Sequence, residues 1–181
     1  MCLFFTLDYN PFMRKIILPL VVAFGVVILI GSFLFANRER RYPEASFSLL
    51  NEAETAWYNA GILDYRVVVE VEFASEHRRH AITVRNGQIT ETTLSYLNGD
   101  TWSPPEPIAV ESAAEYTIPG LFNALRLELN QLMREDLRVD MNETPVYPRY
   151  MYFGAVWVDG EPMADSEARF TVTEFEILTS P

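Results

Sequence analysis

Two histidines with nearby carboxylates are the side chains whose types and spacing most directly suggest metal chemistry. His77 and His80 are the only histidines of the chain, and Glu72 and Glu76 lie close to them. Two imidazoles and a carboxylate are a ligand set that zinc accepts. The segment lacks the helical HExxH framework of zinc hydrolases, and two neighbouring arginines would repel a cation. A zinc site and an ordinary solvated polar loop between two strands are therefore both open interpretations.

A second group of acidic residues lies near the C-terminus, where an acidic loop is expected. Asp159, Glu161, Asp165 and Glu167 fall within nine positions of one another. Carboxylate oxygens at close spacing suit calcium, although this spacing differs from that of an EF-hand loop. The alternatives are a calcium site and a solvated acidic loop.

Trp102 is the residue most suited to contact a partner. It stands in a proline-rich connection with Pro104 and Pro105, which reads as a loop carrying an accessible aromatic side chain. Loops of this kind often carry binding function. Partner binding through Trp102 and packing of the indole back onto the sheet are the two possibilities.

Catalytic and redox signatures are missing from the sequence. It contains no GxSxG elbow, P-loop, GxGxxG or HExxH motif. Its one cysteine, Cys2, precedes the apolar run described next, so the region after that run has no disulfide, thiolate nucleophile or cysteine metal site. We therefore expect no catalytic residue and no cofactor, with a metal-dependent enzyme as the alternative.

An uncharged apolar run at 16–36 indicates where in the cell the chain is located. A helix of this length spans about 30 Å, the thickness of the hydrocarbon core of a bilayer. The run is longer than the apolar part of a cleaved signal peptide, and Leu34 occupies a position where a cleavage site prefers a small residue. The predicted division is an N-terminal segment 1–15, an uncleaved transmembrane anchor 16–36 that contacts the lipid bilayer, a linker 37–42 and one domain 43–181.

The orientation of this single-pass anchor depends on its flanking charges. Basic residues on the two sides are nearly balanced, so the positive-inside rule decides little. If translation starts at Met13 rather than Met1, the chain opens with Met-Arg-Lys and then becomes apolar, as export leaders do. We therefore expect an extracytoplasmic C-terminal domain at the cell membrane.

The region after Arg41 is strongly acidic. It holds nine arginines against 23 aspartates and glutamates, hence a formal charge of −14. Such a surface repels the phosphates of nucleic acids and anionic lipid headgroups. Nucleic acid is therefore not an expected partner.

The pattern of apolar residues predicts an α+β domain with the order α-β-β-β-α-β-β-β. Asn86-Gly87 is a strong hairpin signal between two of the strands. Short turns between strands indicate an antiparallel sheet of about six strands with two helices on one face. The expected helices are 43–60 and 117–134, and the expected strands are 64–73, 81–85, 88–97, 137–141, 149–158 and 168–177.

Short motifs in a characteristic order connect these elements with a known family. The motifs are Trp57, Gly61-Ile62-Leu63-Asp64-Tyr65, Val84-Arg85-Asn86-Gly87-Gln88-Ile89, Thr117 through Leu121-Phe122, and Tyr147-Pro148. Over roughly 53–178 the chain resembles the uncharacterised bacterial family called domain of unknown function 6174. The resemblance implies a secreted or membrane-attached protein and no particular activity.

Two positions depart from that family's pattern. Many members carry a Cys-x-Cys pair near the end of the first strand, where this chain has Val71-Glu72-Phe73-Ala74-Ser75, and Val146 replaces a frequent glycine. No thiol function carries over. The prediction is a membrane-anchored, extracytoplasmic, non-enzymatic module of the bacterial envelope that binds an envelope protein or a ligand. The alternatives are the metal-dependent enzyme and the calcium-binding domain.

Overall fold

A computed structural model describes residues 24–28, 41–131, 134 and 136–179. The chain divides into two compact units, Met1–Arg41 and Tyr42–Pro181. Most of the predicted anchor at 16–36 lies outside the described residues, and the part that is described, 24–28, is helical. Within the described part of the chain, no helix has the length and apolar character needed to cross a bilayer.

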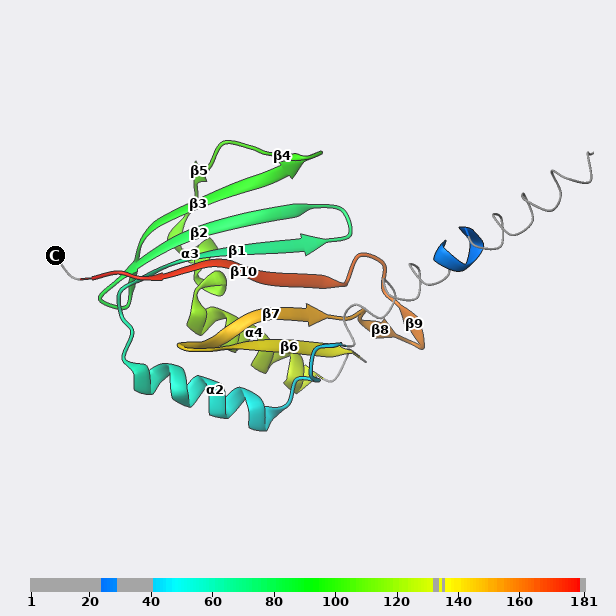
Figure 1. The fold of residues 1–181 in the computed structure, drawn as a ribbon, viewed down its shortest axis with the longest axis horizontal. Coiled ribbons are helices and arrows are strands. Elements are labelled where there is room, and N and C mark those ends of the chain that lie inside the picture. The colour runs from blue at the N-terminus through cyan, green and yellow to red at the C-terminus, as the bar shows by residue number, and fades with distance from the viewer. Residues whose placement is uncertain (1–23, 29–40, 132–133, 135, 180–181) are drawn as a thin grey trace, which may run out of the picture. The chain divides into compact units, whose positions relative to one another are not determined.

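The second unit is built around one large antiparallel sheet (Figure 1). Its strands follow the order β4-β3-β2-β1-β10-β7-β6, with β5 paired to β3, while β8 and β9 form a separate hairpin. The elements are α2 (Phe47–Ala60), β1 (Tyr65–Phe73), β2 (His77–Arg85), β3 (Gln88–Asn98), β4 (Thr101–Trp102), β5 (Glu106–Pro107), α3 (Val110–Ala113), η2 (Ala114–Tyr116), α4 (Ile118–Gln131), β6 (Leu137–Glu143), β7 (Val146–Phe153), β8 (Trp157–Val158), β9 (Glu161–Pro162) and β10 (Ala168–Ile177). The predicted α+β class is confirmed; the short strands β4, β5, β8 and β9 add to the six expected.

Helices α2 and α4 pack against the same face of this sheet, which we call the inner face. Their apolar stripes share one core with alternate residues of β1, including Val67 and Val69. Thr117 caps α4, because its Oγ1 accepts a hydrogen bond from Gly120 N at 3.1 Å. The opposite, outer face carries no helix among the described residues.

Helix α2 begins at Phe47, so the expected start at 43 is wrong. Ser46 has an extended backbone, and its Oγ accepts a hydrogen bond from Leu49 N at 3.3 Å. A serine in this position accepts a hydrogen bond from a backbone N–H of the first turn that has no partner within the helix. The capping serine therefore decides the boundary, rather than the upstream proline.

The three residues before Ser46 extend the sheet at its β6 edge. Ala45 N donates to Leu137 O at 2.8 Å, and Val139 N donates to Pro43 O at 3.1 Å. The ring of Tyr42 lies 4.5 Å from that of Tyr150 on β7. The chain thus enters the domain as a short edge segment.

The opposite edge, formed by β3, is covered by the proline-rich connection that was expected to be a loop. Ser103 N donates to Tyr96 O at 2.8 Å, and Thr92 Oγ1 donates to Ile108 O at 2.6 Å. Prolines in this segment have no N–H to offer a further strand. The connection therefore protects the sheet edge, and it contributes β4 and β5.

Two strand boundaries differ from the expected ones. β2 begins at His77 instead of 81, because His77 pairs in register with Glu72 of β1. β7 ends at Phe153 instead of 158, because Gly154 turns the chain against Asp136. Gly154 N donates to Asp136 O at 2.8 Å, and a Cβ on Gly154 would lie only 2.7 Å from that oxygen.

Candidate functional site

The two histidines lie on opposite faces of β2, so they do not form a joint metal site. His77 is on the outer face, where its ring is 5.0 Å from that of Trp102 and its Nε2 is 3.5 Å from Glu70 Oε2. His80 is on the inner face, where its ring stacks 3.7 Å from that of Tyr116. The three-residue spacing explains this, because neighbouring strand residues alternate between faces. The interpretation of both histidines as one zinc pair is corrected accordingly.

His80 is also not a solvated loop residue. It is 3% exposed, and neither ring nitrogen has a hydrogen-bond partner among the described residues. Burial, with a smaller contribution from the charge of Arg78, lowers the pKa of His80 to about 4. The imidazole is therefore held neutral in the core.

The acidic residues near the C-terminus divide into two places. Asp159 and Glu161 belong to the β8–β9 hairpin, where Asp159 adopts a positive φ of 54°. Asp165 and Glu167 instead line a cleft. Across the described positions, no three acidic or histidine side chains are grouped as a metal ion requires.

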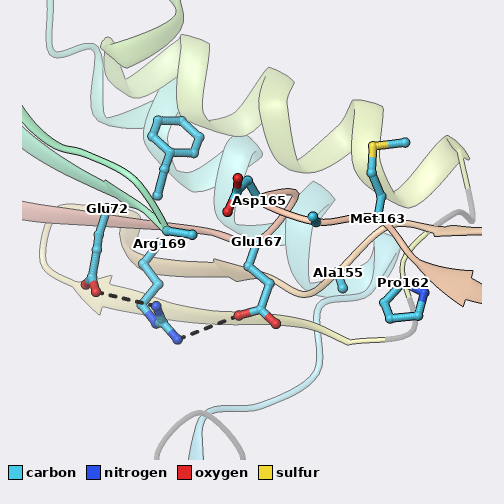
Figure 2. Close-up of a pocket in the computed structure, with 10 residues that line it drawn as sticks. Glu72, Ala155, Pro162, Met163, Asp165, Glu167 and Arg169 are labelled. Atoms are coloured by element: carbon cyan, nitrogen blue, oxygen red, sulfur yellow. Dashed lines mark ion pairs between the residues drawn. The ribbon is translucent and has the colours of Figure 1, made fainter.

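This cleft, which we call the Arg169 cleft, has a volume of about 440 Å³ (Figure 2). Arg169 lies between two carboxylates, 3.5 Å from Glu72 Oε1 and 3.9 Å from Glu167 Oε2. Asp165 adds a third carboxylate, so the lining has more negative than positive charge. The remaining lining is apolar: Phe73, Ala74, Ala155, Pro162, Met163 and Ala164.

Arg134 holds the loop that forms one wall of the Arg169 cleft. Its Nη1 donates to the carbonyl oxygens of Gly154 and Ser166, the latter at 2.6 Å, and its Nε donates to Glu128 Oε2 at 2.7 Å. Ser166 Oγ accepts a further bond from Val156 N at 2.9 Å. One side chain thus joins the two ends of the loop to α4.

Replacing Arg134 by methionine is expected to lower the free energy of unfolding by about 2 kcal/mol, the usual cost of losing hydrogen bonds to a charged group. Urea unfolding of the purified full-length chain measures the change. The matched control is Arg149→Met, which removes a more exposed ion pair with Asp140 and is expected to cost about 0.5 kcal/mol. Equal losses in both variants would contradict the role given to Arg134.

The outer face carries a second hollow, which we call the Trp102 pocket, of about 280 Å³. Trp102 forms one wall, and the Arg79 guanidinium lies 4.0 Å from the centre of its ring. Arg79 is itself held by Glu70, to which its Nε donates at 3.0 Å and its Nη2 at 2.7 Å. Trp102 therefore packs onto the outer face of the sheet, which is one of the two possibilities that the sequence left open. Its side chain also lines a pocket there.

Sequence reasoning missed several residues of the Trp102 pocket. Ser95 lines it and is 7% exposed. Arg66 Nη1 and Glu174 Oε2 form an ion pair of 2.8 Å at the same pocket, although they are 108 positions apart in the chain. Only the pairing of β1 with β10 brings them together, and no local sequence signal contains that pairing.

No family model matches the chain, and no curated protein matches it. The resemblance of 53–178 to domain of unknown function 6174 stays a prediction.

Proposed function

We propose that the chain is a membrane-anchored, extracytoplasmic, non-enzymatic binding module of the bacterial envelope. In this proposal the segment 16–36 is the anchor, and the Arg169 cleft receives a basic segment of an envelope protein. The uncharged apolar run and the missing catalytic motifs support the first part. The charge balance of the cleft supports the second.

The distribution of ion pairs is the observation that carries the proposal. Each of the nine arginines after Arg41 already lies within 4.0 Å of a carboxylate. Because acidic residues outnumber these arginines, some carboxylates are left without an arginine as ion-pair partner. Asp165 is one of them within the described residues, and it lines the cleft. A cationic partner complements this site.

Exposed apolar side chains next to the cleft indicate the rest of the partner's chemistry. Met163 in the lining is 51% exposed, and Trp157 and Val158 of the adjoining hairpin are 39% and 42% exposed. Protein interfaces are enriched in aromatic residues and methionine. The expected ligand is a peptide segment in which lysine or arginine stands beside a large apolar residue.

Substituting Asp165 by asparagine is expected to weaken binding of such a peptide about fivefold, the effect of losing about 1 kcal/mol. The assay is fluorescence anisotropy with full-length protein in nanodiscs and labelled peptides that contain Arg-Leu or Lys-Phe pairs. Asp159→Asn is the matched control, because both aspartates have a positive φ and carry one charge, but Asp159 does not line the cleft. Equal weakening by both substitutions, or equal binding of a peptide with glutamine at the basic positions, would contradict the proposal.

Two cellular experiments test the remaining parts. A photo-crosslinking residue at position 163 in intact cells is expected to capture an envelope protein through a basic segment, and competition by the peptide identifies that site. A reporter fused to the C-terminus is expected to be active outside the cytoplasm. A cytoplasmic signal from that reporter would overturn the proposed topology.

A further inference from the structure

The floor of the Trp102 pocket is a row of small side chains across three strands. Val68 of β1, Ala81 of β2 and Thr93 of β3 are successive register partners. On one side of this row, Arg79 and its register partner Ser95 form the next outer-face row. Because the large side chains of Arg79 and Trp102 border this row of smaller ones, the outer face is hollow at this place.

Ser95 gives the pocket a hydroxyl group that a ligand can reach. The residue is 7% exposed and lines the pocket. A serine hydroxyl can both donate and accept hydrogen bonds, so a polar ligand in the pocket can bond to it. The group points to a polar ligand in this pocket.

The ion pairs around the pocket restrict the kind of polar ligand. The Arg66 guanidinium has N–H groups left after donating one bond to Glu174, and the Glu174 carboxylate has accepting positions left. The charge of Arg79 is balanced by Glu70. The side chains around the pocket therefore carry almost no net charge. They offer hydrogen-bond donors and acceptors next to each other, and a hydroxyl group can bond to both.

The apolar part of the lining adds flat and small surfaces. Trp102 and Pro105 present rings, while Val68 and Ala81 present methyl groups. A ligand that fits must therefore combine C–H surface with several hydroxyl groups in a volume of about 280 Å³. A pyranose ring has this combination.

We propose that the Trp102 pocket binds a hexose ring, either as a free sugar or as a unit of a glycan. In the bound state, Ser95 Oγ hydrogen-bonds one ring hydroxyl, and Arg66 and Glu174 bind hydroxyls at the rim. The C–H groups of the ring pack against Trp102 and Pro105. This site is separate from the Arg169 cleft, so the sugar proposal and the peptide proposal stand or fall independently.

The test is NMR of the full-length chain in a phosphocholine detergent, which has no sugar headgroup, with ¹⁵N-labelled tryptophan. The probes are the methyl glycosides of glucose, galactose, mannose and N-acetylglucosamine, and soluble tetrasaccharides of the same sugars. At least one probe is expected to shift the indole signal of Trp102 in a saturable way, while the signal of Trp57 stays in place. Binding of methyl glycosides indicates a free sugar, and binding of tetrasaccharides alone indicates a glycan.

Two substitutions locate the binding in the pocket. Ala81→Leu fills the floor and is expected to abolish the shift, whereas Thr171→Leu places a leucine on the outer face outside the pocket and is expected to leave it unchanged. Ser95→Ala keeps the volume and is expected to weaken binding about fivefold. The proposal is overturned if no probe shifts Trp102 at saturating solubility, or if binding persists unchanged in a folded Ala81→Leu or Ser95→Ala variant.

Discussion

Replacing Gly120 by alanine is expected to lower the free energy of unfolding by about 3 kcal/mol or more, in the upper range for overpacking a close contact. Gly120 lies in the first turn of α4, directly against η2. A Cβ at this position would lie 2.2 Å from Ala114 O and 2.6 Å from Glu115 O. Both are backbone atoms, so a side-chain rotation cannot relieve the contact and η2 must move away from α4.

The direction of this change in stability distinguishes Gly120 from an ordinary helical glycine. In an ordinary helix, glycine to alanine stabilises by about 1 kcal/mol, because alanine loses less backbone entropy on folding. Chemical denaturation of the full-length chain measures the change, with Asn123→Ala on the exposed side of α4 as the control, expected within about 0.5 kcal/mol of the original chain. A Gly120→Ala protein as stable as the original would show that η2 does not press on α4.

Acidification is expected to destabilise the domain through His80 by about 3 kcal/mol between pH 6.5 and pH 4. The pKa of this imidazole falls from 6.5 to about 4 on folding. Below pH 6.5 the unfolded chain therefore takes up a proton that the folded chain does not yet bind, so stability is lost as the pH falls and the loss is complete below pH 4.

His80→Phe isolates this contribution, because an aromatic ring can keep the stack on Tyr116 while it removes the titrating nitrogens. Denaturation curves at several pH values are compared between the variant and the original chain. We expect the difference in their unfolding free energies to grow by about 3 kcal/mol from pH 7 to pH 4. His77→Gln, which leaves His80 in place, is expected to retain the original acid sensitivity; parallel curves for His80→Phe and the original chain would contradict the prediction.

The parts of the fold that local sequence could predict are those decided by local chemistry. Asn86 and Gly87 both have positive φ, as their hairpin requires, and Thr117 caps its helix. Val67 and Val69 stand two positions apart on β1 and both lie in the core, as alternation along a strand requires. In each case the signal and the structural cause lie within a few residues of one another.

The parts that could not be predicted depend on pairing between distant strands. Polar residues from His77 onward look like a loop until their pairing with β1 makes them a strand, and that strand then turns His80 inward. The Trp102 pocket likewise exists because three strands place Val68, Ala81 and Thr93 side by side. The composition indicated an acidic surface, but only the ion pairs in the structure show which carboxylates have no arginine partner.

The short edge segment at β6 has a mechanical consequence. Tension on the chain ahead of Tyr42 reaches the domain through a strand that lies along β6, not through the end of α2. Ala45 and Pro43 hold that strand by two backbone hydrogen bonds, and the Tyr42–Tyr150 contact adds to them. A pull along the strand therefore acts on these contacts, in shear, before it acts on α2.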